Sequence, residues 1–534
     1  MSLVKNVGTI GGLTAFSRIF GFARDILLAR VLGAGLAADA FQLAFILPNT
    51  FRRLFAEGAF SVAFVPMYTR SLAGEGGEEA AEKFANDVLA VFIWVLLGFS
   101  AIAMLAMPAI VWVLASEFRE IPGKFALSVT LARITFPYLT LISLVAMLSG
   151  VLNARSRFAP GAFVPVLLNL VLITGIGTGW FLRRNGGSDV TVAYAVAIAV
   201  TLSGIAQLAY MVWATRKAGV RLKCHVPRFT PEVKRLAMLI LPATFGAGVY
   251  QVSQFVDTFF ATSLEQGSLT LLKYADRLNQ MPLGIVGIAL GTAILPMLSR
   301  HIQTNDNAQA QRLQSNAVEI GLLLTLPAAA ALAVCAPAFV TAFFVGGKMT
   351  SADGAVMANI VIALVAGLPS YVLVKVFQPA FFSREDTRTP VWVAAATLIV
   401  NIAINFYVVP RYGIVGLAAA TAFTSTLNVA ALYVLLHHRS WYTLTPRLMG
   451  KVLRQLIATA AMAGVLIILM PLMQSRYGGS IIEKVWSLGV LVGAGLITFF
   501  VIAYAVGALD KDLLGQLRRR KPASANGQAS DSEQ

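Results

Sequence analysis

The chain has 534 residues, of which 57% are hydrophobic and only 13% are charged, and its mean hydropathy is +0.75. This composition excludes a soluble globular protein of this length and indicates a polytopic membrane protein. The formal net charge of +17 would suit nucleic-acid binding, but no nucleic-acid-binding module surrounds the basic residues, so we expect no nucleic acid as a partner.

Apolar runs close to or above the roughly 20 residues needed to cross a bilayer recur from one end of the chain to the other. They are too continuous for the strands of a membrane barrel. We therefore predict an all-α polytopic membrane protein with about fourteen transmembrane helices. The expected spans are 7–33, 37–71, 84–115, 125–153, 159–182, 190–215, 233–262, 267–301, 314–345, 354–383, 389–409, 413–437, 450–473 and 485–508.

The distribution of basic residues predicts the orientation. With a cytoplasmic N-terminus, both termini and the even-numbered loops hold most of the 42 Lys and Arg residues, and the opposite loops, to which we assign Lys273 and Lys348, hold few. The positive-inside rule therefore places both termini in the cytoplasm. One loop on that side has a dense basic cluster, expected to contact anionic lipid headgroups: Arg216, Lys217, Arg221, Lys223, Arg228, Lys234 and Arg235.

Internal repetition organises the chain. Pro48 and residues 66–70 in the first half match Pro282 and residues 296–300 in the second, and the fourth and tenth helices give a second match in the same order. Six helices return the chain to the side on which it started, so we expect two lobes of like orientation, related by an axis along the membrane normal. The predicted divisions are an N-lobe at 1–222, a C-lobe at 223–440, two further helices at 441–510 and a basic, disordered cytoplasmic tail at 511–534.

The first helix carries charge at membrane depth, which usually indicates function. Ser17 and Arg24 share one face at i and i+7, and Arg18 and Asp25 share the neighbouring face. Arg30 lies closer to the helix end, from where its side chain can reach the membrane interface.

The second helix carries a further charged group after Pro48, where we predict a kink. Asn49, Arg53 and Glu57 follow at i, i+4 and i+8, and an Arg53–Glu57 ion pair is plausible. Arg52 points to an adjacent face without a similarly placed acid, which makes it the better ligand candidate.

The eighth helix adds Asp276 and Arg277, followed by glycines that permit close helix packing. We predict that Arg18, Arg24, Arg52 and Arg277 meet across a cavity between the lobes. The planar guanidinium binds phosphate oxygens in a bidentate manner and stays charged when it is partly desolvated, so the set suits a pyrophosphate or another multiply charged anion. The alternative is internal pairing of each arginine with an acid: Asp25, Asp39, Glu57 or Asp276.

A second cluster combines Asp257 with Asn401, Asn405 and Thr421. Oxygen ligands of this kind suit a small hard cation, so sodium or proton coupling is one interpretation. Hydrogen bonding between helices is the other.

The sequence has no recognised catalytic motif. None of the four histidines has a catalytic or metal-ligating partner at a recognised spacing, and no Gly-Lys-Ser/Thr phosphate loop occurs. Cys224 and Cys335 are far apart in sequence, so we expect no disulfide, no metal bound by cysteine and no cofactor.

Three stretches carry a resemblance to a known family: residues 17–25, with the sequence SRIFGFARD; residues 38–41, ADAF; and residues 48–60, PNTFRRLFAEGAF. Residues 274–277, YADR, and 287–292, GIALGT, extend it into the second half. The chain resembles the MurJ (MviN) family of the multidrug/oligosaccharidyl-lipid/polysaccharide exporter superfamily. That family is understood to flip lipid II, the undecaprenyl-pyrophosphate-linked peptidoglycan precursor, across the bacterial inner membrane.

The resemblance implies a V-shaped pair of six-helix lobes and an alternating-access flippase that moves lipid II from the cytoplasmic to the periplasmic leaflet. Arg18, Arg24, Arg52 and Arg277, with Asn49 beside Arg52, would bind the headgroup. Asp25 and Asp39 would orient arginines or take part in gating, a group to which we add Ser17, Glu57 and Asp276. The last two helices would form an apolar groove for the lipid tail.

The resemblance also implies a sodium site at Asp257, Asn401, Asn405 and Thr421, although Asn405 stands where such a site uses a second carboxylate. We expect the membrane potential to be a further energy source. The expected partners are lipid II, membrane lipids and cell-wall synthesis proteins, and the protein is expected to act as a monomer. The alternatives are a related exporter of another lipid-linked saccharide or a drug, a polyprenyl-phosphate transferase and a non-transporting scaffold.

Overall fold

The protein is all-helical through the part that the computed structural model describes, which is residues 3–53, 59–223 and 225–509. The first-half helices are α1 (Leu3–Leu32), α2 (Leu36–Arg52), α3 (Ala59–Ala73), α4 (Gly77–Leu105), α5 (Met107–Leu114), η2 (Ser116–Arg119), α6 (Lys124–Thr135), α7 (Tyr138–Ala154), α8 (Ala159–Arg184) and α9 (Asp189–Lys217). The remaining helices are α10 (Pro231–Thr262), α11 (Ser268–Pro282), η3 (Leu283–Gly287), α12 (Ile288–Gln303), α13 (Asn307–Phe343), α14 (Ser351–Ala366), α15 (Leu368–Phe382), α16 (Arg388–His438), α17 (Pro446–Met473), η4 (Gln474–Arg476) and α18 (Ile481–Ala505).

Several expected spans are interrupted at proline, which cannot donate the backbone hydrogen bond of a regular helix. Pro108 follows the break between α4 and α5, Pro137 precedes α7, and Pro369 stands in the first turn of α15. Pro282 ends α11 and is followed by the π-helical turn η3. Each interrupted pair, such as α6 with α7, covers one predicted span.

The long helix α16 reverses direction at Gly413. This glycine has φ 59° and ψ −143°, which is not helical, and a side chain built on Gly416 would come within 2.7 Å of Val408. Residues eight apart in a straight helix are about 12 Å apart along its axis, so the chain doubles back here. The expected spans 389–409 and 413–437 are therefore the two arms of α16.

Nine helical segments in the described residues are long and apolar enough to cross a membrane. The protein is thus a polytopic membrane protein. Four segments fall outside that set, namely α1, α2 with α3, α10, and α11 with α12. Each of the four carries charged residues within an otherwise apolar sequence.

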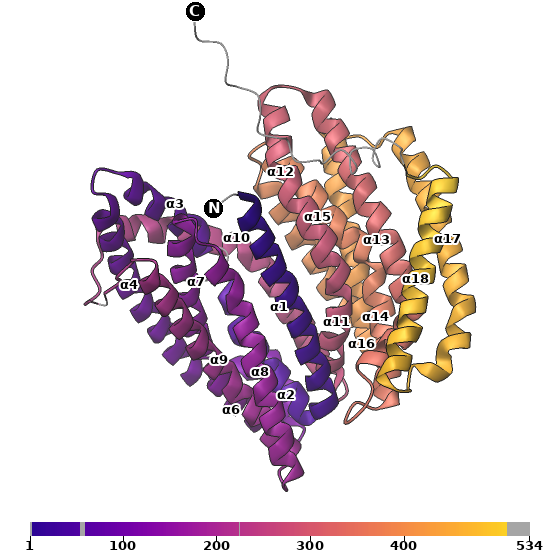
Figure 1. The fold of residues 1–534 in the computed structure, drawn as a ribbon, viewed down its shortest axis with the longest axis horizontal. Coiled ribbons are helices and arrows are strands. Elements are labelled where there is room, and N and C mark those ends of the chain that lie inside the picture. The colour runs from indigo at the N-terminus through magenta and orange to yellow at the C-terminus, as the bar shows by residue number, and fades with distance from the viewer. Residues whose placement is uncertain (1–2, 54–58, 224, 510–534) are drawn as a thin grey trace, which may run out of the picture.

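The helices form two groups (Figure 1). The group containing α3, α4 and α6 to α9 lies on one side, α11 to α16 lie on the other, and α1 runs between them. Helices α17 and α18 lie at the outer edge of the second group, next to α13. Helix α10 begins against the first group, because Val233 and Leu236 join the buried cluster that contains Phe60 and Phe64.

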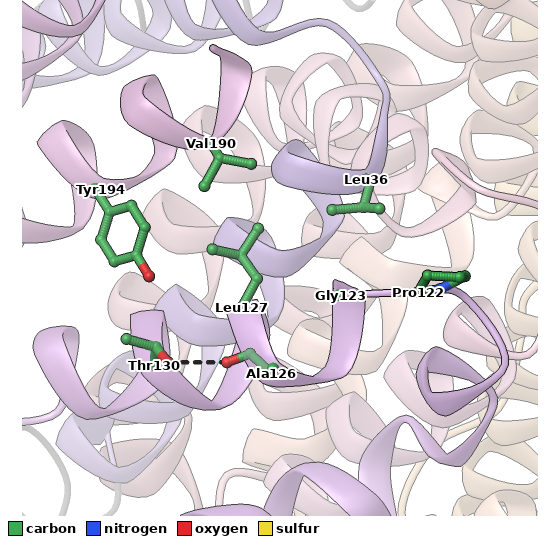
Figure 2. Close-up of a pocket in the computed structure, with 8 residues that line it drawn as sticks. All are labelled: Leu36, Pro122, Gly123, Ala126, Leu127, Thr130, Val190 and Tyr194. Atoms are coloured by element: carbon green, nitrogen blue, oxygen red, sulfur yellow. Dashed lines mark hydrogen bonds between the residues drawn. The ribbon is translucent and has the colours of Figure 1, made fainter. Parts of the chain in front are cut away.

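A surface hollow lies where α2, α6 and α9 begin (Figure 2). None of the candidate charged residues lines it. Its lining residues are Leu36, Pro122, Gly123, Ala126, Leu127, Thr130, Val190 and Tyr194.

The assignment of Lys273 to a loop needs correction, since this lysine lies inside α11, which begins at Ser268. Lys451, in the second turn of α17, is buried against Glu319 of α13 with both oxygen distances at 2.9 Å. A buried ion pair thus joins α17 to the second group.

Candidate functional site

Asp25 of α1 contacts two arginines from different helices. Its Oδ1 accepts hydrogen bonds from Nη2 of Arg24 at 2.7 Å and from Nε at 3.0 Å. Its Oδ2 lies 2.6 Å from Nε of Arg277, which comes from α11 in the other group of helices. Arg24 and Asp25 are each 6% exposed, whereas the Arg277 side chain is 42% exposed. One buried carboxylate therefore holds two cations, and the outer one remains accessible.

Asn169 of α8 fixes the other side of Arg24. Its Oδ1 accepts from Nη1 of Arg24 at 3.0 Å, and its Nδ2 donates to the carbonyl of Ser17 at 3.0 Å. Gly21 lies beside this amide, since a Cβ there would be 3.4 Å from it, an ordinary van der Waals contact. Asn169 is buried, so Arg24 is held between two side chains.

Arg18 reaches across to the π-helical turn η3. Its Nη2 donates to the carbonyl oxygen of Gly284 at 3.3 Å. A Cβ on Gly284 would lie 2.3 Å from Nη1 of Arg18, so with a larger residue the guanidinium would have to move from this position. π-Helical turns are frequent at functional sites. Here the turn receives a cation from the other group of helices.

Lys375 of α15 lies against the same turn. A Cβ on Gly287 would lie 3.1 Å from Cδ and 3.3 Å from Nζ of Lys375, and one on Gly291 would lie 3.7 Å from its Cβ. The glycines that we interpreted as helix-packing residues thus adjoin two basic side chains, Arg18 and Lys375.

On α2, the predicted residues Arg52 and Asn49 contact each other. Arg52 donates from Nε to Oδ1 of Asn49 at 3.2 Å, and the two belong to the same helix. Glu57, and with it the predicted Arg53–Glu57 pair, lies outside the described residues. Asp276 accepts a hydrogen bond from Gln280, one turn further along α11.

The proposed cation ligands divide into two sets. Asn405 donates to Oδ1 of Asn401 at 3.0 Å, and Asn401 donates to Thr424 at 3.2 Å. Thr421 donates to the carbonyl of Leu417 in its own helix. Asp257 instead interacts electrostatically with Lys273 and Asp276 on α11.

The donor set fits a sodium ion in part. Oδ1 of Asn405 and Oδ1 of Asp257 are both buried and have no hydrogen-bond partner, so each could serve as a ligand. Oδ1 of Asn401 already accepts from Asn405, and the charge of Lys273 opposes a cation near Asp257.

Asp39 joins three helices at one end of the molecule. Its Oδ2 lies 2.9 Å from Nζ of Lys124 on α6 and accepts from the backbone N–H of Gly267 at 2.7 Å. Its Oδ1 accepts from the backbone N–H of Thr270 at 3.1 Å and from the Thr270 hydroxyl at 2.7 Å. Asp39 is 2% and Lys124 1% exposed. The carboxylate also suits the positive N-terminal end of α11.

Arg30 contacts the far end of α13. Its Nε and Nη2 donate to the carbonyls of Phe343 and Ala342 at 3.0 and 2.9 Å. Gly347, with φ 61°, approaches so closely that a Cβ would lie 2.2 Å from the carbonyl oxygen of Arg30. The guanidinium of Arg30 thus binds two carbonyls of the second group of helices, a contact that the sequence did not predict, while its place at the membrane interface stays a prediction.

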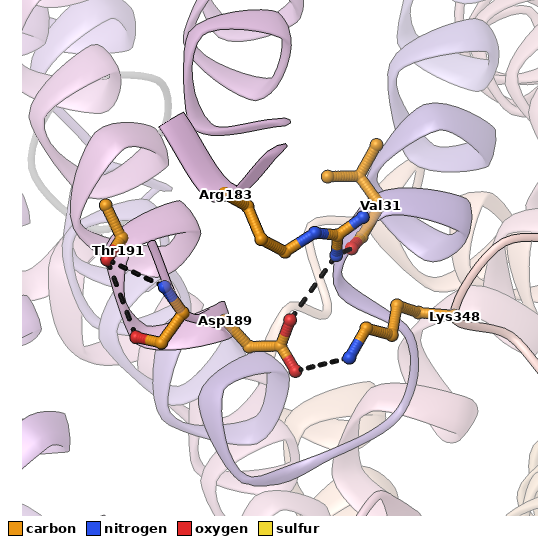
Figure 3. A network of polar contacts seen from close by, with 6 residues as sticks. Val31, Arg183, Asp189, Thr191 and Lys348 are labelled. Atoms are coloured by element: carbon orange, nitrogen blue, oxygen red, sulfur yellow. Dashed lines mark hydrogen bonds and ion pairs between the residues drawn. The ribbon is translucent and has the colours of Figure 1, made fainter. Parts of the chain in front are cut away.

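Asp189 forms a third contact at the same end (Figure 3). Its carboxylate lies 3.3 Å from Nη1 of Arg183 and 3.0 Å from Nζ of Lys348, and Arg183 also donates to the carbonyl of Val31. This group, which we call the Asp189 clasp, joins α1, α8 and α9 to the loop after α13. The two groups of helices are thus fastened together at this end by Asp39, Arg30 and the Asp189 clasp.

The arrangement is suited to binding an anion rather than to covalent chemistry. Three cations, Arg24, Arg277 and Arg18, have one buried carboxylate among them. Within the described residues, no group of three or more His, Cys, Asp or Glu side chains could hold a metal ion.

Sequence reasoning missed Asn169, Lys375 and the Asp189 clasp. Two of these residues had a signal in the sequence. Lys375 is a lone lysine between valines in an apolar run, and Asn169 is the single asparagine in the apolar α8. The clasp had no such signal, because it joins loops that are distant in sequence.

Comparison with known proteins shows a relationship over the whole chain. Residues 28–486 match the family model described as lipid II flippase MurJ. A probable lipid II flippase MurJ from Rhizobium meliloti (strain 1021) is 38% identical over 535 residues, covering 99% of each chain. The protein of the same description from Rhizobium tropici is 37% identical over 532 residues, covering 98% of each chain.

Solved structures show the same fold. A lipid II flippase MurJ in an inward closed conformation matches with a TM-score of 0.75 at 24% identity, covering 95% of this chain and 99% of the other. A multidrug resistance MATE family transporter of the MOP superfamily, in an inward-facing conformation, matches with a TM-score of 0.66 at 14% identity, covering 79% of this chain and 94% of the other.

Proposed function

The chain belongs to the MurJ lipid II flippase family, and we propose that it moves lipid II from the cytoplasmic to the periplasmic leaflet by alternating access between two lobes. It is a transporter and not an enzyme. The observation that carries the mechanism is the contact of Arg24 and Arg277, from opposite lobes, with the single carboxylate of Asp25.

The pyrophosphate of lipid II would bind where these cations converge. Arg277 is accessible and is held by one contact to Asp25, so an incoming phosphate can replace that carboxylate with two hydrogen bonds from the guanidinium fork. Arg18 is likewise held by a single neutral carbonyl, that of Gly284. Lys375 supplies a further positive charge on the other side of η3, and Arg52 with Asn49 extends the set along α2.

Release of lipid II would require the two lobes to separate at the end where Asp39, Arg30 and the Asp189 clasp join them. Under the topology that the basic loops predict, Asp39, Arg30 and the Asp189 clasp lie at the periplasmic end, and both termini are cytoplasmic. We therefore assign the structure to the state whose periplasmic end is closed. Asp39 would act as a gating residue, since separation of α2 from α11 must break its bonds to Gly267 and Thr270.

The architecture proposed for this cycle has fourteen membrane crossings in the bacterial inner membrane. They divide into an N-lobe at 1–222, a C-lobe at 223–440 and two added helices at 441–510, followed by a cytoplasmic tail at 511–534. The interrupted helices and the reversal at Gly413 support the count. The exposed apolar side chains of α17 and α18, such as Ile467, Ile468 and Ile497, support a role in holding the lipid tail.

Energy coupling belongs to the same proposal. An inside-negative potential acts differently on a cationic empty cavity and on one neutralised by substrate, with about 2.3 kcal/mol available per charge per 100 mV. Asp257, Asn401, Asn405 and Thr421 are the proposed sodium site, supported by the two buried oxygens that lack hydrogen-bond partners.

A related exporter of another lipid-linked saccharide or of a drug is the alternative, since a fold alone does not specify the substrate. Reconstitution distinguishes them. Purified protein in vesicles is supplied with lipid II, with another undecaprenyl-pyrophosphate-linked saccharide or with a cationic drug, and movement across the bilayer is followed for each. We expect lipid II to move; transport of either competitor without lipid II would reject the proposal.

A further inference from the structure

Arg133 of α6 is a charged residue on an apolar outer surface of the N-lobe. It is exposed, and it lies beside the end of α4, where Ile102 is 69% and Leu105 79% exposed. Neighbouring α9 also exposes large apolar side chains, Ile198 and Leu202. Such a surface faces lipid, so Arg133 places a guanidinium where the bilayer surrounds the protein.

One hydrogen bond fixes this side chain. Nε of Arg133 donates at 3.0 Å to the carbonyl of Met104, whose usual helical partner four residues later would be Pro108, which has no N–H. The bond therefore satisfies a carbonyl left unpaired by the break between α4 and α5. It uses only one edge of the guanidinium, and within the described ranges Arg133 has no acidic partner.

The hollow of Figure 2 reaches Thr130, which precedes Arg133 by about one helical turn, and Arg133 itself does not line it. It has a volume of about 360 Å³ and begins at the loop of Pro122 and Gly123. Ala126 and Thr130 line it and, with Arg133, follow at i, i+4 and i+7 on one exposed face of α6. The hydroxyl of Tyr194 borders it from α9, and none of its lining residues is charged.

We propose that this groove binds an anionic phospholipid whose phosphate pairs with Arg133. Arg133 lies nine residues beyond Lys124, the first residue of α6, or about 13 Å along the helix, so a headgroup that enters at the loop before α6 needs a path along this helix. The groove supplies that path as far as Thr130. A phosphate offers the guanidinium the bidentate partner that the protein does not provide. No acidic side chain lines the groove to hold an ammonium group, which favours an anionic over a zwitterionic headgroup.

This inference concerns a regulatory or structural lipid at the periplasmic leaflet and is independent of lipid II binding in the cavity. It uses the proposed topology only to assign the leaflet.

Native mass spectrometry of the full-length protein with added phosphatidylglycerol or phosphatidylcholine tests it. Arg133→Gln should lower phosphatidylglycerol binding about tenfold, which is about 1.4 kcal/mol, and leave phosphatidylcholine binding unchanged. Arg411→Gln is the matched control, because Arg411 is also exposed and donates to one backbone carbonyl, that of Tyr407, at 2.9 Å.

A second variant covers the case in which Arg133→Gln does not fold. Thr130→Trp fills the groove and leaves the bond between Arg133 and Met104 in place, and it should displace phosphatidylglycerol to a similar extent. Binding of phosphatidylglycerol at the wild-type level in a folded Arg133→Gln or Thr130→Trp protein would overturn the proposal. Equal binding of phosphatidylglycerol and phosphatidylcholine by the wild type would also overturn it.

Discussion

Asp25 of α1 and Arg277 of α11 form an ion pair of 2.6 Å between Oδ2 and Nε, which joins the two lobes through the candidate substrate site. The same carboxylate binds Arg24. Under the proposed function, a substrate anion and Asp25 would compete for the same cations, and Asp25 would recover the arginines when the substrate leaves.

Asp25→Asn should therefore bind lipid II more tightly and transport it more slowly. We expect an affinity gain of about tenfold, or about 1.4 kcal/mol, because the competing negative charge is gone. Binding to purified protein and translocation in vesicles measure the two effects. Asp276→Asn is the matched control: it removes a nearby charge that bonds only Gln280 of its own helix among the described contacts, and it should change both quantities less.

The effects of substitutions at Asp39 and Lys124 on the free energy of unfolding should be strongly coupled. Removal of one member of a buried pair leaves an uncompensated charge and costs roughly 3–5 kcal/mol. We expect Asp39→Asn to lower the free energy of unfolding by about that amount, and Asp39→Asn with Lys124→Met to recover most of it. Unfolding in detergent tests this, and a double variant as unstable as Asp39→Asn would show that the buried charge is not the cause.

The same variant tests the gate. Cysteines at positions 35 and 266, one on each lobe, can be joined by a short cross-linker in a background with Cys224→Ser and Cys335→Ser. The position suits the test because a Cβ on Gly35 would lie 3.7 Å from the Gln266 side chain. Asp39→Asn should lower the yield of cross-linked protein, and an unchanged yield would remove Asp39 from the gate.

Much of the fold could be predicted from sequence, because apolar runs and proline positions depend on local chemistry. The charges on α1, α2 and α11 were also visible. The contacts of Arg30 with the carbonyls of Phe343 and Ala342 could not be predicted, because they depend on how the two groups of helices pack together.

The details of the site depend on that packing too. Periodicity places Arg24 and Asp25 on neighbouring faces, but it does not specify that Asn169 of α8 completes the contacts of Arg24. It likewise does not specify that Lys375 lies against Gly287. These contacts join residues more than eighty positions apart.

Lys375→Gln should weaken lipid II binding by roughly threefold to tenfold, since it removes a cation beside η3, whereas Lys375→Arg should bind within about twofold of the wild type. Lys348→Gln makes the same charge change at the fastened end and should leave affinity unchanged. Binding isotherms at one fixed ionic strength provide the comparison. Equal losses in Lys375→Gln and Lys348→Gln would indicate a general charge effect instead.

Sodium should raise the thermal stability of the wild type more than potassium does. At a concentration about ten times the dissociation constant, the gain is about 1.4 kcal/mol. Asn405→Leu should abolish the difference between the ions. Asn428→Leu is the matched control, since Asn428 is on the same helix, donates to Thr397 and also has a buried Oδ1 without a partner. Equal stabilisation of the wild type by both ions would reject the site.

The sidedness of lipid II in cells depleted of their own flippase tests the central claim most directly. The wild-type chain, Arg24→Ala, Arg277→Ala and the surface control Arg411→Ala are expressed at equal, verified levels in the inner membrane. We predict that the wild type and Arg411→Ala restore lipid II to the periplasmic leaflet, and that Arg24→Ala and Arg277→Ala insert normally but leave it on the cytoplasmic side. Restoration by both cavity variants at the wild-type level would contradict the assignment of these arginines to the substrate.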